Sequence, residues 1–176
     1  MKSDSDLVWI VDRAMAQAVQ KSGNWLACHP GCSDCCHGPF DITELDSRRL
    51  KIGLAALASS DSARAARVQI RAIQALKQTA LDHDDPCPAL DPENGTCDLY
   101  EARPLTCRTF GPPVRCGDAA VGVCELCFHG ATDAQITACE VTVDPDGLES
   151  TLLNELGNPP ATTVAAALAI TKPSPC

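Results

Sequence analysis

The sequence predicts a mainly α-helical but irregular fold, in which helices pack on a loop-rich lobe organised by cysteine-ligated metal. Aromatic residues make up only 3% of the 176 residues, which favours close-packed helices over a sheet. Several segments repeat apolar residues every three or four positions, whereas two others are rich in Cys, Pro and Gly. Because metal–thiolate bonds can replace a hydrophobic core, the pattern indicates a single cysteine-cluster metal-binding domain over residues 1–176.

The first predicted helix covers residues 4–22. Asp4 or Ser5 is the expected cap at its start, and Gly23 marks its end. Its apolar stripe consists of Val8, Val11, Met15 and Ala18. Two tryptophans flank this helix and are predicted to be packing anchors, Trp9 and Trp25.

Two further helices are predicted after the first cysteine-rich segment. One follows Thr43, with acidic residues in its first turn, and runs to about residue 58; the other starts at Ser60 or Asp61 and runs to residue 80. Their stripes are Leu50, Leu54 and Leu57 in the former, and Ala66, Ile70, Ile73, Leu76 and Ala80 in the latter. The basic residues of the latter helix are interpreted as a solvated face, Arg64, Arg67, Arg71 and Lys77.

Shorter helical segments are predicted towards the C-terminus. Residues 133–138 suit one helical turn, and residues 144–147 (D-P-D-G) suit a turn or a helix start. Leu148, Leu152 and Leu156 form a short stripe, and residues 163–170 predict a last apolar helix. In contrast, residues 82–130 have no clear periodicity and are expected to be organised by metal.

Charge and hydropathy restrict the partners. The formal net charge of -9 should repel phosphate backbones, so no nucleic-acid partner is expected. No apolar run approaches the roughly 18–20 residues that span a membrane, and the N-terminus lacks the pattern of a signal peptide. The chain is therefore expected to be cytoplasmic, where its twelve cysteines would bind metal rather than form disulfides.

The first cysteine-rich segment, residues 28–40, reads C-H-P-G-C-S-D-C-C-H-G-P-F. Cys32 and Cys35 have the two-residue spacing that lets two sulfurs face one ion, as do Cys124 and Cys127. Neighbouring side chains are expected to diverge, so the adjacent Cys35 and Cys36 favour an iron–sulfur cluster, such as [4Fe–4S], or two separate metal sites. One of the pair could instead pack behind the other, and zinc bound by cysteines is the close alternative.

The second cysteine-rich segment holds six more thiols, Cys87, Cys97, Cys107, Cys116, Cys124 and Cys127. Arg103 and Arg108 bracket Cys107, and guanidinium groups beside thiolates would lower their pKa. The alternative is that both arginines pair with nearby carboxylates. Tyr100, the only tyrosine, could hydrogen-bond to a sulfur or to a neighbouring carbonyl group.

Three motifs in this order resemble the YkgJ-type cysteine-cluster family, described as zinc- or iron-chelating and similar to flagellin lysine N-methylases. The motifs are C-x3-C-x2-C-C at 28–36, C-P-x-L at 87–90 and C-x2-Y-E-x-R-P-x2-C-R at 97–108. The resemblance implies about eight metal-binding cysteines, with Tyr100, Arg103 and Arg108 on the third motif. The implied ligands are Cys28, Cys32, Cys35, Cys36, Cys87, Cys97 and Cys107, with an eighth from Cys116, Cys124 or Cys127.

The function expected from these features is binding of a metal ion or cluster, either iron as an iron–sulfur cluster or zinc. The alternative, implied by the similarity to flagellin methylases, is a protein lysine N-methyltransferase-like enzyme that carries the metal site. The chain shows no glycine-rich turn for S-adenosylmethionine, which counts against that alternative. An acidic chain could nevertheless attract a lysine-bearing protein partner.

Overall fold

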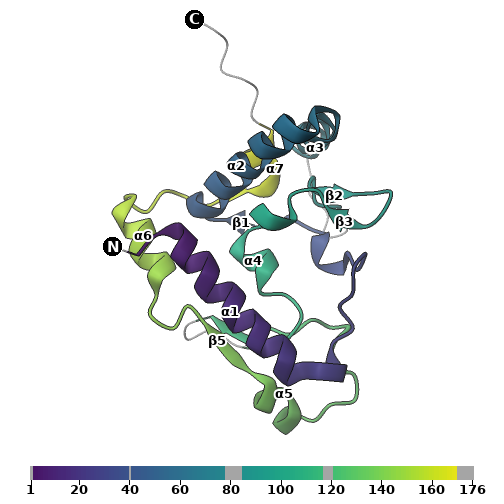
Figure 1. Cartoon of the computed structure of the whole chain (residues 1–176), viewed down its shortest axis with the longest axis vertical. Coiled ribbons are helices and arrows are strands. Elements are labelled where there is room, and N and C mark those ends of the chain that lie inside the picture. The colour runs from purple at the N-terminus through teal and green to yellow at the C-terminus, as the bar shows by residue number, and fades with distance from the viewer. Residues whose placement is uncertain (1, 40, 78–84, 117–120, 170–176) are drawn as a thin grey trace, which may run out of the picture. The chain divides into compact units, whose positions relative to one another are not determined.

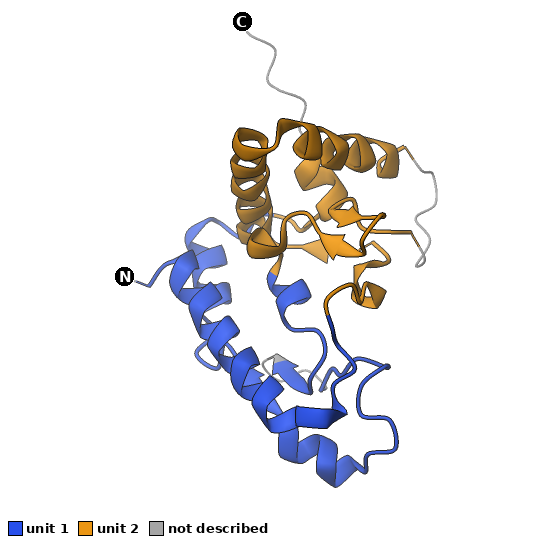
Figure 2. Ribbon diagram, turned by 45° about the vertical axis from the view of Figure 1, so that its right-hand side comes forward, with its two compact units in different colours: residues 1–29, 105–159 blue, residues 30–104, 160–176 orange. Residues whose placement is uncertain are grey.

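The computed structural model describes residues 2–39, 41–77, 85–116 and 121–169. Within these ranges the chain is mainly helical, as predicted, with seven α-helices and three short pairs of strands. It divides into two compact units (Figure 2), which we call unit 1 (Met1–His29 and Leu105–Pro159) and unit 2 (Pro30–Pro104 and Pro160–Cys176). Each unit combines two separate stretches of chain, and one domain over residues 1–176 stays a prediction.

Helix α1 (Asp4–Ser22) confirms the first predicted helix and is the longest element of unit 1 (Figure 1). Its cap is Ser3, one residue before the expected position, which exchanges hydrogen bonds with Asp6. Its buried face consists of Leu7, Val11, Met15, Ala18 and Ser22. Trp9 is 60% exposed beneath the Arg13 guanidinium, so its prediction as a packing anchor was wrong.

The other elements of unit 1 pack along α1. Strand β4 (Val114–Cys116) pairs in parallel with β5 (Val141–Val143), and α1 contacts β5, the short α4 (Leu105–Arg108), α5 (Asp133–Cys139) and α6 (Leu148–Glu155). The predicted turn at residues 144–147 leads into α6, because the Asp144 carboxylate accepts the N–H groups of Leu148 and Glu149.

Unit 2 is built on three helices that pack together (Figure 1): α2 (Glu44–Ser60), α3 (Ser62–Ala75) and α7 (Val164–Leu168). Their starts follow the sequence closely, since Thr43, Asp61 and Thr163 each accept a backbone N–H of the first turn. The core consists of Ile42, Leu50, Leu54, Ala65, Val68, Ala72, Ala89, Leu99, Val164, Ala167 and Leu168.

The face that α3 buries differs from the predicted one. Its buried residues are Ala65, Val68 and Ala72, whereas Ile70 and Leu76 of the predicted stripe are 54% and 53% exposed. Small side chains at three- and four-residue spacing let α3 approach α2 and α7 closely, which the larger residues would prevent. The helix ends at Ala75; residues 78–80 of its expected range lie outside the described residues.

Short elements shape the rest of unit 2. Strands β2 (Leu90–Asp91) and β3 (Thr96–Cys97) form a hairpin that leads into the 3₁₀ turn η3 (Tyr100–Ala102). A second antiparallel pair joins β1 (Asp41–Ile42) to β6 (Thr162–Thr163), and η2 (Asp34–Cys36) carries the adjacent cysteines. None of the helices in the described ranges is long and apolar enough to cross a membrane.

Candidate metal centre

Backbone hydrogen bonds bring three cysteine-bearing segments of unit 2 together. The Cys87 N–H donates to the Cys36 carbonyl oxygen at 2.7 Å, and the Gly38 N–H donates to that of Asp85 at 2.8 Å. The Leu90 N–H in turn donates to the Cys87 carbonyl oxygen at 2.9 Å, and Leu90 pairs with Cys97 across the β2–β3 hairpin. Residues far apart in the sequence thus carry thiols into one region.

The four thiols of this region act on one another. The pKa of the Cys36 thiol is raised by its hydrogen bond to Cys35, by burial, and by the charges of Cys35, Cys87 and Cys97. The same hydrogen bond lowers the pKa of Cys35 to about 6. We call Cys35, Cys36, Cys87 and Cys97 the unit 2 thiols. Because the 3₁₀ turn points two neighbouring thiols at each other, the expectation that they diverge was wrong.

The lowered pKa gives a pH-dependent prediction for the metal-free protein. The rate of Cys35 alkylation by iodoacetamide, followed by mass spectrometry, should reach half its maximum near pH 6, far below its ordinary pKa of 9.0. Cys36, whose pKa is raised, should react slowly over the same range. The stabilisation from the Cys35 thiolate is complete above that ordinary value and is lost as the pH falls through about 6.

The variant Cys36→Ala provides the control for this titration. It removes the thiol that donates to Cys35, so the midpoint of Cys35 alkylation should move up towards the ordinary thiol range. An unchanged midpoint in Cys36→Ala, or a wild-type midpoint above about pH 8, would show that the two thiols do not share a proton.

Burial raises the pKa of the other two unit 2 thiols, and backbone N–H groups and nearby arginines reduce this increase. Burial raises the pKa of Cys87 to about 11, whereas the N–H groups of Ala89 and Leu90 and the charge of Arg71 act in the opposite direction. Burial also raises the pKa of Cys97, against the Leu99 N–H and the charge of Arg103. N–H groups aimed at sulfur favour thiolates, which are the form that binds metal.

Tyr100, Arg103 and Arg108, the non-cysteine residues predicted to support the metal site, differ in their contacts. Arg103 lies with its guanidinium carbon 3.8 Å from the centre of the Tyr100 ring, donates to the Tyr100 carbonyl oxygen at 3.1 Å, and lowers the pKa of Cys35 and Cys97 by its charge. The Tyr100 side chain is more than half exposed. In unit 1, buried Arg108 donates to both carboxylate oxygens of Asp12 at 2.8 Å each. A role of Arg108 beside thiolates stays a prediction.

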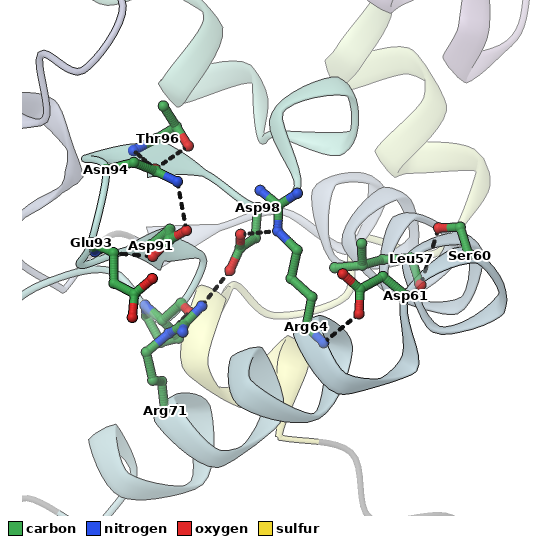
Figure 3. A network of polar contacts seen from close by, with 11 residues as sticks. Leu57, Ser60, Asp61, Arg64, Arg71, Asp91, Glu93, Asn94, Thr96 and Asp98 are labelled. Carbon is green, nitrogen blue, oxygen red and sulfur yellow. Dashed lines mark hydrogen bonds and ion pairs between the residues drawn. The ribbon is translucent and has the colours of Figure 1, made fainter.

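A buried carboxylate beside the unit 2 thiols escaped the sequence analysis. Asp98, which follows Cys97, has a side chain only 2% exposed, and it accepts hydrogen bonds from Arg64 and Arg71 of α3 at 2.5 Å each (Figure 3). The interpretation of these two arginines as a solvated face was therefore wrong. Their spacing of seven residues, two turns on one helix face, was the available signal.

The ten predicted ligands fall into two groups, one in each unit. Unit 2 holds Cys32 together with the four unit 2 thiols; unit 1 holds Cys28, Cys107, Cys116, Cys124 and Cys127, of which the Cys116 side chain lies outside the described residues. None of the ten cysteines with a described side chain forms a disulfide. Among the described residues, no three His, Cys, Asp or Glu side chains are arranged to hold a metal ion, so organisation by metal stays a prediction.

A helical chain that brings cysteines from separate loops together, with backbone N–H groups and arginines supporting their thiolates, defines a thiol-rich protein of the metal-binding class. The chain belongs to the CxxCxxCC family, described as "Putative zinc- or iron-chelating domain", whose model matches residues 27–129, more than half of the chain. This match confirms the resemblance seen in the motifs. Searches of curated proteins and of solved structures found no match.

Proposed function

We propose that this chain chelates zinc or iron through the unit 2 thiols, Cys35, Cys36, Cys87 and Cys97. The observation that carries the proposal is the hydrogen bond of 2.7 Å from the Cys87 N–H to the Cys36 carbonyl oxygen, together with the pairing of Leu90 with Cys97, because these contacts bring the three cysteine-bearing segments together. Thiolates gathered in this way repel each other unless a cation lies among them. A bound metal ion supplies that cation and releases the thiol protons.

The surroundings of the unit 2 thiols favour the metal-bound form. Four thiolates around a divalent ion leave a net negative charge, which Arg71 and Arg103 would offset because their charges already act on Cys87, Cys35 and Cys97. The N–H groups of Ala89 and Leu90 act to lower the pKa of Cys87, and that of Leu99 acts to lower the pKa of Cys97. Such outer contacts orient metal ligands and tune the metal.

Two forms of the site use the same four cysteines. The hydrogen bond between Cys35 and Cys36 supports a single zinc or iron ion, because it brings two neighbouring sulfurs towards one point. An iron–sulfur cluster is the second form, since a [4Fe–4S] cluster also takes four cysteine ligands. Cys32, two residues before η2, is a further candidate ligand of unit 2 in both forms.

The first experiment is the metal and acid-labile sulfide content of the full chain, purified without oxygen. Zinc or iron without sulfide would identify a single-ion site, and brown protein with iron and matching sulfide would identify the cluster. The double variant Cys87→Ser/Cys97→Ser should lose the metal of unit 2. The matched control is Cys139→Ser, because the buried Cys139 thiol of unit 1 donates to the Lys21 carbonyl oxygen at 3.4 Å.

Either of two results would refute the proposal. One is wild-type protein that binds neither zinc nor iron, whether as purified or after reconstitution. The other is a Cys87→Ser/Cys97→Ser variant that keeps its full metal content.

The alternative of a lysine N-methyltransferase-like enzyme has no support in the contacts of the described residues or in a matched relative.

Chelation also fits the cellular setting that we propose, the cytoplasm, because a reducing environment keeps thiols available for metal. The chain carries a net charge of -9, which repels phosphate groups, so we do not propose nucleic acid as a partner.

A further inference from the structure

We infer that unit 1 carries a second zinc site, formed by Cys28, Cys124 and Cys127 and separate from the unit 2 thiols. The sulfur atoms of Cys28 and Cys127 lie 3.8 Å apart. Zinc–sulfur bonds of about 2.3 Å at tetrahedral angles place two sulfurs about 3.8 Å apart. The pair thus already has the spacing of one edge of a zinc–thiolate tetrahedron. The inference extends the proposed function but does not need the unit 2 thiols.

The third sulfur lies in the same turn as Cys127. The Cys127 N–H donates to the Cys124 carbonyl oxygen at 2.9 Å, which closes the turn. Cys124 and Cys127 are separated by two residues, the spacing that lets both sulfurs of a turn face one ion. The described side chains do not yet enclose an ion, so the Cys124 thiol must turn towards the Cys28–Cys127 pair when zinc binds.

A strained residue follows this turn. Phe128 has φ 60, in the left-handed region that is unfavourable for an aromatic residue, whereas the other such non-glycine residues in the described ranges are an aspartate and an asparagine. The Phe128 N–H donates to the Trp25 carbonyl oxygen at 2.8 Å, and the two rings stack with centroids 6.0 Å apart. Strain that its surroundings hold in place often accompanies a functional site.

The contacts of Trp25 and Phe128 explain how Cys28 reaches the turn. Trp25 lies three residues before Cys28, so its attachment to Phe128 fixes the segment that carries the first thiol. Between them, the Ala27 N–H points at the Cys127 sulfur at 3.5 Å. Gly111 also approaches the pair, since a Cβ there would lie 3.1 Å from the Cys28 sulfur. Backbone groups thus lie close to both thiols of the pair.

The three thiols differ in burial, and this difference leaves one side of the site open to solvent. Cys127 is buried, Cys124 is half-buried and Cys28 is exposed. Three protein sulfurs leave one position of the tetrahedron, which an exchangeable ligand such as water or a small thiol would fill from the exposed side. Zinc bound in this way can be transferred, unlike zinc enclosed by four cysteines.

The test uses cobalt as a probe for zinc in the full-length chain. The chain has two tryptophans, so Trp9→Phe leaves Trp25 as the only one. Co²⁺ in excess should quench Trp25 fluorescence through one equivalent bound in unit 1, and excess Zn²⁺ should reverse the quenching. Cys28→Ser and Cys124→Ser should each weaken this binding by more than about 100-fold, because loss of even an outer contact to a ligand costs about 10–100-fold. Cys28 is exposed, so its replacement should leave the fold intact, which circular dichroism checks.

The controls separate this inference from the proposed function. Cys36→Ser/Cys87→Ser should remove cobalt from unit 2 but leave Trp25 quenching unchanged. Quenching that survives in Cys28→Ser and Cys124→Ser, or that disappears in Cys36→Ser/Cys87→Ser, would overturn the second site. If only the unit 2 proposal were wrong, the chain would bind a single cobalt ion, and that ion would still quench Trp25.

Discussion

Replacing Asp98 with Asn should lower the free energy of unfolding by about 3 kcal/mol. The Asp98 side chain is 2% exposed and receives one hydrogen bond from each of Arg64 and Arg71. An amide of the same shape has no charge and presents an N–H₂ group to one of the two guanidinium groups. Two cations would then face each other without the carboxylate between them. The side chains of Arg64 and Arg71 are 35% and 22% exposed, so water screens their charges. The expected loss of unfolding free energy is therefore at the lower end of the range for breaking a buried ion pair.

This substitution should also weaken metal binding, because Asp98 connects α3 to the loops of the unit 2 thiols. Arg71 donates to Asp98 (Figure 3). It also donates to the Pro88 carbonyl oxygen at 2.8 Å, so it contacts the residues next to both Cys97 and Cys87. Once Asp98 is neutral, Arg71 loses its ion pair with the loop of Cys97 and keeps only its hydrogen bond to the Pro88 carbonyl oxygen beside Cys87. Urea unfolding of the metal-free and metal-loaded chains measures the two effects.

Arg67→Gln is the matched control for Asp98→Asn, since Arg67 is exposed on the same helix. It should change the free energy of unfolding by no more than about 0.5 kcal/mol. Equal urea midpoints for wild type and Asp98→Asn would mean that the two ion pairs contribute nothing in solution. Arg64→Gln and Arg71→Gln should each cost less than Asp98→Asn, because each leaves the carboxylate one partner.

Replacing Gly53 with Ala should also destabilise the chain, by about 1–2 kcal/mol, although alanine is the better helix former. Gly53 lies within α2, where a Cβ would collide with the Ala102 Cβ and lie 3.9 Å from the Leu99 side chain. Ala102 belongs to η3, which follows Cys97, so the helix and the third cysteine motif meet at this glycine. The added methyl group must push the two segments apart.

A compensating change makes this prediction sharp. Ala102→Gly removes the methyl group that the new side chain meets, so Gly53→Ala/Ala102→Gly should recover about 1 kcal/mol relative to the sum of the single variants. Ile52→Ala, at a neighbouring position that is 70% exposed, should be nearly neutral. If Gly53→Ala raised the urea midpoint, its effect would be helix propensity alone, and the close approach of α2 and η3 would not exist in solution.

The helices were predictable where short-range chemistry decides them. Thr43 and Asp46 form a capping box within one turn, and Asp61 accepts the Arg64 N–H, so both starts depend on neighbouring residues only. The buried face of α3 was not predictable in this way. An alanine-rich helix offers several apolar stripes, and Asp98, 34 residues beyond Arg64 and 27 beyond Arg71, selects the one that turns inward.

Cysteine spacing and the motif around Arg103 were sufficient to predict the family, which is described as zinc- or iron-chelating. Which thiols meet depends on the tertiary structure. Cys28 is four residues from Cys32 along the chain, yet it lies beside Cys127, 99 residues away, and in a different unit from Cys32. Spacing reports which sulfurs a local turn can bring together. Contacts between distant thiols depend instead on backbone hydrogen bonds, such as that from Cys87 to Cys36 and that from Phe128 to Trp25, which form only when the chain has folded.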